Sequence, residues 1–167
     1  QLYTGNGASS HSITNNANSG NFKPDWLWIK QRSQGSRAHS LWDTSRGNSL
    51  RLQSDNAYGE ETQTGDQKTF DTNGFTVGGG AITNENNQTH VAWQWKCNGG
   101  TSSASGSESG SNLAYDFQVN TTSKFMINKY TGRGSSSTLN LGNHFTPQFM
   151  IFKNRSQGDD WVVYHHK

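Results

Sequence analysis

Cysteine, proline and long hydrophobic runs are nearly missing from this sequence. Its single cysteine, Cys97, excludes an internal disulfide, and we expect it to be a small buried apolar side chain, with a cross-link between chains as the alternative. No run approaches the roughly 18 apolar residues of a membrane span, so membrane insertion is not expected. The sequence begins at Gln1 without a signal peptide and stops inside a strand-like motif, which predicts a processed or partial piece of a longer protein.

An excess of charge of either sign is also missing. The chain has 14 Lys and Arg against 12 Asp and Glu, a net charge of +2, and neither sign forms a long block. This balance argues against a dedicated nucleic-acid surface and against a polybasic membrane surface. Nucleic acid is therefore not an expected partner.

Apolar residues are scarce, but aromatic residues are not. Only 29% of the residues are hydrophobic, whereas aromatic residues reach 11% and include six Trp. Large rings must supply much of the core, because each buries on the order of 150–250 Å². Gly, Ser, Thr and Asn fill much of the rest, and no stretch shows the 3.6-residue apolar period of a helix. The composition therefore predicts an all-β chain of short strands joined by tight turns.

One stretch of the chain returns in a second copy. Residues 22–35, FKPDWLWIKQRSQG, match residues 145–158, FTPQFMIFKNRSQG, at an offset of 123 positions (145 − 22). Two flanking blocks match in the same order, namely Tyr3-Thr4-Gly5 with Tyr130-Thr131-Gly132 and Leu41-Trp42-Asp43 with Val163-Tyr164-His165. Three ordered matches predict one repeat of roughly 125 residues followed by the opening third of a second.

Each copy has the sequence of a β-hairpin. A proline in each copy removes a backbone donor and therefore belongs just before a strand. The four apolar residues that follow, 26–29 and 149–152, leave both faces apolar, which is typical of a strand covered on both sides. A polar segment ending in Gly then predicts a turn, and a second strand is expected at 40–44 or 161–165. We therefore expect both hairpins near the middle of a β-sheet.

Further stretches extend the predicted sheet. Asn73-Gly74 is a hairpin-turn signal, since both residues tolerate positive φ. His90–Cys97 alternates, and its apolar side chains, including Trp93 and Trp95, share one face, which is typical of a half-buried strand. We expect core positions for these two indoles and for Trp28, because each belongs to an apolar strand pattern.

The repeat divides the chain into three parts. Residues 1–97 are expected to form a first β-sandwich repeat. Residues 98–112 have no apolar residue except Ala104 and are expected to be a Gly/Ser-rich linker or a mobile loop. Residues 113–167 carry the opening strands of a second repeat, which either is incomplete or completes the first sandwich or that of a neighbouring chain.

Taken together, these motifs resemble an uncharacterised repeat domain. The series YTGNG, FKPDWLWIKQRS, LWDTSRG, NGFTVG and HVAWQWK, followed by Asn120-Thr121-Thr122, is similar to a repeat of tail and fibre proteins of marine and cyanobacterial phages. The resemblance covers nearly the whole chain in order. It implies an antiparallel β-sandwich similar to the concanavalin A-like (laminin G-like) jelly roll, in a virion or surface module that often occurs in tandem.

The two copies differ at two aspartates. Gln148 stands in the second copy where the first has Asp25, and His165 stands where the first has Asp43. A functional role shared by both copies would need the carboxylate in each. The difference therefore favours a structural role for both aspartates.

No catalytic signature is present. Jelly-roll glucanases use two carboxylates closely spaced on one strand face, one as acid and one as nucleophile. The adjacent pairs Glu60-Glu61 and Asp159-Asp160 would point to opposite faces of a strand or lie in a loop. A serine nucleophile elbow and a Cys–His pattern are also missing. We therefore expect no enzymatic activity and disfavour a polysaccharide-active enzyme fragment.

No cofactor or metal is expected either. His165 and His166 would point to opposite faces of a strand and so would not share one ion. Residues 55–61 offer several oxygen ligands in one loop, which is the kind of ligand that calcium favours, but their spacing fits no EF-hand. Calcium is thus the alternative to a solvated acidic loop.

Glycan binding is the ligand function that the composition favours. A sugar site combines an apolar ring platform with a few polar groups. Trp42, Arg46 and Tyr58 lie near predicted loops and are the candidate ligand-binding residues. A place in the core is an equal alternative for Trp42, and an ion pair with Asp43 across a turn is the alternative for Arg46.

The prediction is a non-enzymatic structural and adhesion module of a phage tail fibre or virion appendage, with host-surface glycans as the expected ligand. Its expected location is the virion. Its expected partners are copies of itself, other virion subunits and cell-surface polysaccharide, because the edge strands of a partial repeat need a neighbour. The alternative is a subunit of a secreted bacterial surface filament or lectin, at the cell surface or outside the cell.

Overall fold

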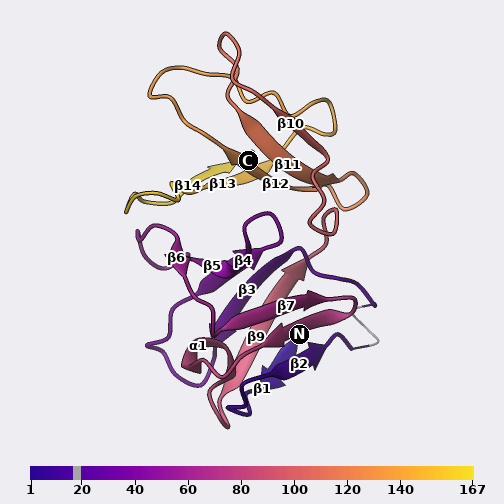
Figure 1. The fold of residues 1–167 in the computed structure, drawn as a ribbon, viewed down its shortest axis with the longest axis vertical. Helices are drawn as coiled ribbons and strands as arrows, with labels where there is room; N and C mark the ends of the chain where they lie inside the picture. Colours follow the sequence, from indigo (N-terminus) through magenta and orange to yellow (C-terminus); the bar gives the residue numbers. More distant parts are fainter. Residues whose placement is uncertain (17–19) are drawn as a thin grey trace.

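The computed structural model describes residues 1–16 and 20–167, and nearly all of their regular structure is β-strand. Within these residues the helical structure is confined to the four-residue α1 (Ala81–Asn84). The all-β fold predicted from composition is confirmed. The strands form four antiparallel sheets (Figure 1), whose orders are β1-β9-β3-β4-β5-β6, β2-β8-β7, β10-β11-β12 and β13-β14.

The first two sheets contain the strands of residues 1–97. The six-stranded sheet consists of β1 (Leu2–Thr4), β9 (Thr89–Trp95), β3 (Trp26–Gln31), β4 (Ser40–Asp43), β5 (Gly47–Gln53) and β6 (Glu61–Thr62). The three-stranded sheet consists of β2 (His11–Thr14), β8 (Gly74–Val77) and β7 (Gln67–Asp71).

These two sheets pack face to face as a sandwich with one apolar core. The six-stranded sheet contributes Leu27, Ile29, Trp42 and Ala92 to this core, and the three-stranded sheet contributes Ile13, Phe75 and Val77. Leu27 and Ile29 alternate with two tryptophans along β3, so the strand places its aliphatic side chains inward and its indoles outward. The antiparallel β-sandwich is confirmed, whereas its jelly-roll identity stays a prediction.

The hairpin predicted at Asn73-Gly74 forms between β7 and β8. Asp71 pairs with Gly74 at its end. Gly74 has a φ of 107°, and a Cβ atom there would lie 2.1 Å from the carbonyl oxygen of Ile13. Glycine is therefore required at this position both by the backbone conformation and by the close approach of β2.

The strand predicted at His90–Cys97 also forms, but the prediction of its buried face is wrong. His90 and Ala92 are buried, whereas Trp93 is 42% exposed. β9 lies between β1 and β3, and its small Ala92 side chain faces a core already filled by Trp42 and the rings of the other sheet. The large indoles therefore lie on the outer face of the six-stranded sheet, and Trp28, Trp93 and Trp95 are not part of the core.

The second half of the chain packs against that outer face. It contains β10 (Ala104–Gly106), β11 (Tyr115–Asn120), β12 (Phe125–Tyr130), β13 (Phe149–Phe152) and β14 (Val162–His165). In Figure 1 this half lies above β4 and β5.

The stretch 98–112, predicted to be a flexible linker or mobile loop, has local structure. β10 forms within it and pairs with β11 in the register Ala104↔Phe117. Ser109 and Asn112 exchange two backbone hydrogen bonds of 3.2 and 2.9 Å. The prediction missed this order because the pairing partners lie further along the chain.

The cysteine is free and buried, as predicted. Cys97 is 5% exposed, and its thiol donates to the carbonyl oxygen of Phe125 at 3.5 Å. Burial raises the pKa of this thiol to about 11. The sulfur is therefore protonated at neutral pH and lies between the two halves of the chain.

The two hairpins matched in the sequence have the same register. β3 pairs with β4 as Trp26↔Asp43 and Ile29↔Ser40, and β13 pairs with β14 as Phe149↔His165 and Phe152↔Val162. Their surroundings differ. β3 and β4 occupy the middle of the six-stranded sheet, whereas β13 and β14 form a sheet of two strands.

The prediction that the second hairpin is also covered on both sides and central in a sheet is wrong. Phe149 is 59% exposed, and Val162, Val163 and Tyr164 are exposed as well. Apolar residues on both faces of β13 suggested coverage, but among residues 1–16 and 20–167 no strand pairs with its edge opposite β14.

Candidate functional site

The three predicted ligand-binding residues do not converge on one site. Trp42 is 0% exposed within the sandwich core, so its indole offers no face to a sugar and the core alternative holds. Arg46 is enclosed by ion pairs, as described below. Tyr58 is 62% exposed in the loop between β5 and β6. The prediction is wrong for Trp42, because β4 lies in the centre of its sheet and not at a loop.

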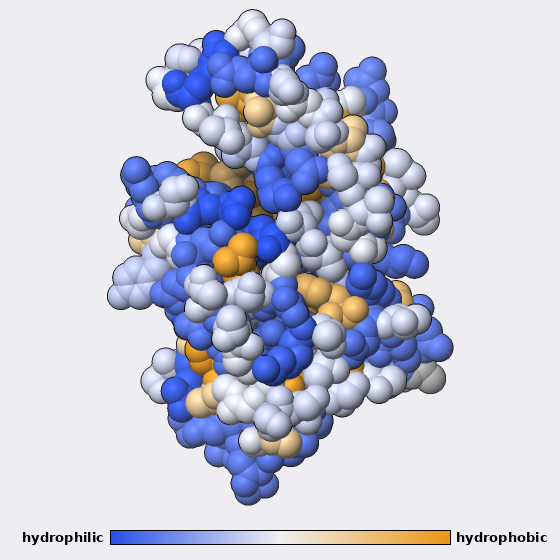
Figure 2. Space-filling view, viewed as in Figure 1, coloured by the Kyte–Doolittle hydropathy of each residue, from blue (hydrophilic) through white to orange (hydrophobic). Residues whose placement is uncertain are grey.

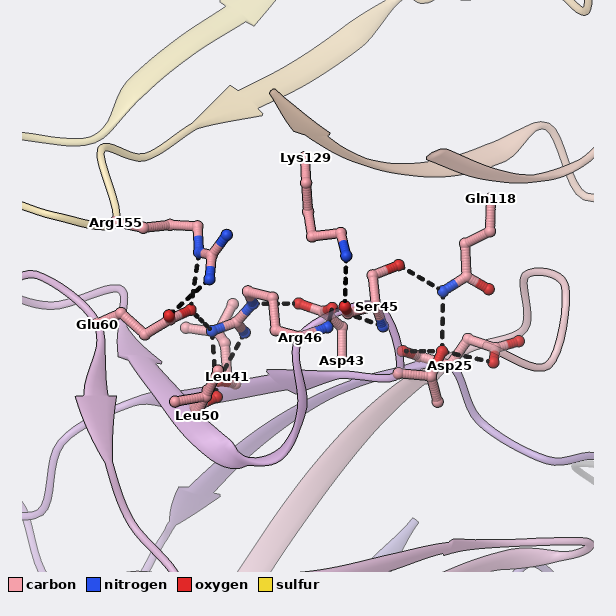
Figure 3. Close-up of polar contacts among 11 residues, drawn as sticks. Asp25, Leu41, Asp43, Ser45, Arg46, Leu50, Glu60, Gln118, Lys129 and Arg155 are labelled. Carbon is pink, nitrogen blue, oxygen red and sulfur yellow. Dashed lines mark hydrogen bonds and ion pairs between the residues drawn. The ribbon is translucent and has the colours of Figure 1, made fainter. Parts of the chain in front are cut away.

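Arg46 is the centre of a buried ion network (Figure 3). Its Nε lies 2.5 Å from Oδ2 of Asp43, and its Nη1 lies 3.0 Å from Oε2 of Glu60. The same guanidinium donates to the carbonyl oxygen of Leu50 at 3.1 Å. Glu60 also binds Arg155 of the C-terminal hairpin at 2.7 Å. The Arg46 side chain is 4% exposed, so it is buried within this network and joins three segments of the chain.

Glu60 is held as a carboxylate between the two arginines. Burial raises its pKa, but hydrogen bonds from Arg155 and Arg46 and their positive charges outweigh burial, so the pKa lies below its ordinary value. The backbone reinforces this contact, since the Glu60 N–H donates to the Arg155 carbonyl oxygen at 2.8 Å. This network anchors the C-terminal hairpin to the first sandwich.

Asp25 anchors the other C-terminal strands. It is fully buried, and its Oδ2 accepts the N–H groups of Cys97 at 2.6 Å and Gly99 at 3.0 Å. Its Oδ1 accepts the hydroxyl of Thr44, whose oxygen in turn accepts from Gln118 of β11, both at 2.8 Å. Figure 3 shows this chain of contacts between the two halves. The structural role predicted for Asp25 agrees with this arrangement.

Asp43 is also structural. Its Oδ1 accepts the N–H groups of Ser45 at 3.0 Å and Arg46 at 2.9 Å and so caps the turn between β4 and β5. Lys129 of β12 donates to the Ser45 carbonyl oxygen at 2.9 Å. The sequence contained no signal for Gln118, Lys129 or Arg155 as joining residues, because each acts across a long sequence separation.

The outer face of the six-stranded sheet bears four indoles in two cross-strand pairs. Trp26 is opposite Trp95 and Trp28 is opposite Trp93, with ring centroids 4.7 and 5.4 Å apart. Phe125 of β12 stacks on the first pair at 5.8 Å from Trp26 and 6.1 Å from Trp95. Among the described residues no ring stacks on the second pair in this way; His39 meets Trp28 edge-on at 5.7 Å, and Trp93 is exposed.

His39 holds the Trp28 indole in place. The Trp28 Nε1–H donates to Nδ1 of His39 at 2.9 Å, so His39 must be neutral with its proton on Nε2. Burial lowers the pKa of His39, and the charge of Lys30 lowers it further, while Asp55 opposes both. At neutral pH the open aromatic pair therefore has an uncharged imidazole beside it.

A groove runs beside the covered indole pair, where the six-stranded sheet meets the C-terminal strands. It has a volume of about 1010 Å³ and is lined by β12 and β13, by residues 138–142 and 145–148, and by Trp26, Leu41 and Leu52 of the six-stranded sheet. Figure 2 shows hydrophobic side chains inside a hollow in the upper half of the molecule. Its lining is mostly apolar.

The acidic loop suggested for calcium has other partners. Asp55 accepts the His39 N–H at 3.1 Å, and Glu61 binds Arg51 at 2.5 Å. No group of three or more His, Cys, Asp or Glu within residues 1–16 and 20–167 could hold a metal ion. The predictions of no cofactor and no catalytic activity stay predictions.

The fold and site define a β-sandwich with an open aromatic face and a second, smaller group of strands docked beside it. Across residues 1–167 the chain matches the model of a domain family described as a domain of unknown function, DUF7483, and it belongs to that family. No curated protein and no solved structure matches it. Among the described residues, no helix has the length and apolar character needed to cross a membrane.

Proposed function

We propose that this chain is a non-enzymatic recognition and assembly module that binds glycans on the open aromatic face of its sandwich. The single observation that carries the proposal is the cross-strand pair Trp28 and Trp93, whose outer ring is 42% exposed. Isolated exposed apolar residues are common, but two adjacent indoles on a sheet face, with their ring planes inclined at 58°, offer a ligand a continuous apolar surface.

The chemistry of the platform suits a neutral sugar. The C–H face of a pyranose packs on an indole, and its hydroxyl groups need donors and acceptors at the rim. The His39 imidazole lies beside Trp28 with Nε2 as a donor, because Nδ1 accepts the indole proton. Lys30 on the same face adds a positive charge near the rim, although three backbone carbonyl oxygens already hold its ammonium group.

A phage tail fibre or other virion appendage is the proposed setting, and it rests on the sequence resemblance alone. In such a setting the proposed partners are copies of the chain, other virion subunits and host-surface polysaccharide. The alternative, a secreted bacterial filament or lectin subunit, uses the same aromatic face. Both settings place the module where surface glycans occur.

We also propose that the two matched hairpins belong to a repeated unit. Besides the shared register, each hairpin has a lysine that closes its loop. Lys30 donates to the carbonyl oxygens of Gln31, Gln34 and Arg37, and Lys153 donates to those of Asn154, Gln157 and Asp159. The first two acceptors match at the offset of 123, and the third lies one residue earlier in the second loop (37 + 122 = 159). This agreement supports a repeat beyond the matching letters.

A glycan array followed by titration tests the binding proposal, with intrinsic tryptophan fluorescence as the readout. Trp93→Ala should weaken binding of any retained glycan about tenfold or more, since removal of a central aromatic contact typically costs at least about 1.4 kcal/mol. Tyr58→Ala removes a still more exposed ring, 62% against 42%, from the loop between β5 and β6 and serves as the control.

The outcomes separate the alternatives. Loss of binding with Tyr58→Ala but not with Trp93→Ala would move the site to the loop between β5 and β6 and overturn the proposal. Turnover of a polysaccharide by the purified chain would contradict its non-enzymatic part.

A further inference from the structure

The free edge of β13 corresponds to the edge of β3 that binds β9. At the end of β3, the backbone N–H of Arg32 donates to the carbonyl oxygen of Thr89 in β9. Successive N–H groups of a strand point to alternate edges, so the N–H of Trp28, four residues earlier, also faces β9. In β13, Gln148 accepts from His166 at 2.6 Å, so the N–H groups of Met150 and Phe152 face β14. The N–H groups of the alternate residues Phe149 and Ile151 therefore point away from β14, and no strand in the described part of the chain pairs with them.

The free edge of β12 corresponds in the same way to β1. Next to β1, the carbonyl oxygen of Gln1 accepts the N–H of Ala92, and the N–H of Gly5 donates to the carbonyl oxygen of Gln88. By the same alternation, the backbone N–H of Tyr3 faces β9. In β12, Thr131 donates to Ala114, so the N–H of Tyr130 faces away from β11. Tyr130 is the position that matches Tyr3 in the two Tyr-Thr-Gly blocks.

The strands that carry these two free edges, β12 and β13, both line the groove, whose volume is about 1010 Å³. In the first sandwich the space between β1 and β3 holds β9, which pairs with both. β12, which matches β1, and β13, which matches β3, thus both border an apolar groove. Among the described residues, no strand occupies the position that β9 has in the first sandwich.

We infer that this groove is a binding slot for one extended β-strand from a partner, with the alternating pattern of β9. The strand has bulky apolar side chains at every second residue and runs antiparallel to β13. By the register of β9 on β3, it places one large side chain opposite Ile151 and the next opposite Phe149, as Trp93 and Trp95 lie opposite Trp28 and Trp26. Backbone hydrogen bonds supply affinity, and the apolar lining selects the side chains.

The test is binding of a peptide with the sequence of residues 88–96, QTHVAWQWK, to the full chain. Fluorescence anisotropy of the labelled peptide should show saturable binding with a stoichiometry of one. A peptide of the same composition without the alternation, QTWWHVAQK, should bind at least about tenfold more weakly.

Two proline variants make the test specific to this edge. Ile151→Pro removes an N–H that faces the groove, and proline is tolerated at an edge strand position whose N–H is unpaired. It should abolish peptide binding and leave the hairpin intact. The backbone N–H groups of Val162 and Tyr164 face β13, so the N–H of Val163 points to the opposite edge of the hairpin. Val163→Pro removes that N–H and should leave peptide binding unchanged.

Binding equally affected by both variants, or no saturable binding at all, would overturn the inference. A dimer of the chain that the peptide dissociates would support it and would identify the partner strand as part of a second copy. The result is independent of the glycan proposal, since Trp93→Ala leaves β12 and β13 untouched and should bind the peptide normally.

Discussion

The hairpins β3–β4 and β13–β14 have the same local structure in opposite surroundings. Both have one register and one lysine-closed loop, yet Trp42 is 0% exposed while Tyr164, its counterpart, is 45% exposed. The hairpin conformation is therefore set by local sequence, namely the proline, the apolar run and the polar loop. Burial is set by the neighbouring strands: β3 and β4 have β9 and β5 beside them, whereas among the described residues β13 and β14 pair only with each other.

The largest predicted difference between the hairpins is at Trp42 and Tyr164. Trp42→Ala should lower the free energy of unfolding by about 3–5 kcal/mol, because it empties the middle of the sandwich core. Tyr164→Ala should cost less than about 1 kcal/mol, because its ring is half in solvent. Urea denaturation of the two variants measures both values. Equal losses would mean that the second hairpin is as well packed as the first.

The next difference is at Asp25 and Gln148. Asp25→Ala should cost about 2–4 kcal/mol, because the N–H groups of Cys97 and Gly99 lose a charged acceptor in a buried place. Gln148→Ala changes an exposed side chain and should be nearly neutral. Thermal unfolding of both variants provides the comparison, and a neutral Asp25→Ala would contradict the anchoring role of this carboxylate.

The smallest effect concerns the contact that holds the second hairpin in place. Glu60→Gln should lower stability at pH 7 by about 1–2 kcal/mol, because Arg46 and Arg155 lose their shared carboxylate. The pKa of Glu60 in the folded chain lies below its ordinary value of 4.5. Its contribution is therefore complete above that pH and disappears as the pH falls through the lowered pKa.

Urea denaturation of Glu60→Gln and the parent chain between pH 3 and pH 7 checks this dependence. The stability difference should shrink at the acid end. Glu108→Gln is the matched control, because Glu108 forms a mostly exposed pair with Arg133 and should show little effect at any pH. A difference that stays constant with pH would contradict the ionised state of Glu60.

The sequence predicted the elements of this fold better than their faces. Alternation identified β9, and the prolines and loops identified both hairpins, since these signals are local. The face of β9 was assigned by the alternation of apolar side chains, with Trp93 expected inside, but the core between the two sheets already held Trp42 and Phe75. Small Ala92 fits there, so the indoles lie outside and form the candidate site.

The candidate site could not be predicted from the sequence, because packing between the sheets decides which aromatic rings are accessible. Trp42 and Trp28 both belong to apolar strand patterns, and only the packing of the second sheet shows which ring is accessible. Arg46 was recognised as a partner of Asp43, which lies three residues away. Its pairing with Glu60, and the pairing of Glu60 with Arg155, depend on contacts that the chain makes only after both halves have folded.

Amide hydrogen exchange of the dilute chain, resolved by residue with NMR, tests the central claim most directly. The account predicts that the Trp28 N–H, bonded to β9, exchanges only with global unfolding, whereas the Ile151 N–H, its counterpart, exchanges rapidly. The neighbouring Met150 N–H, bonded to β14, should be slower than that of Ile151. An Ile151 amide as protected as that of Trp28 would show that the edge of β13 is already paired and would contradict the open strand position.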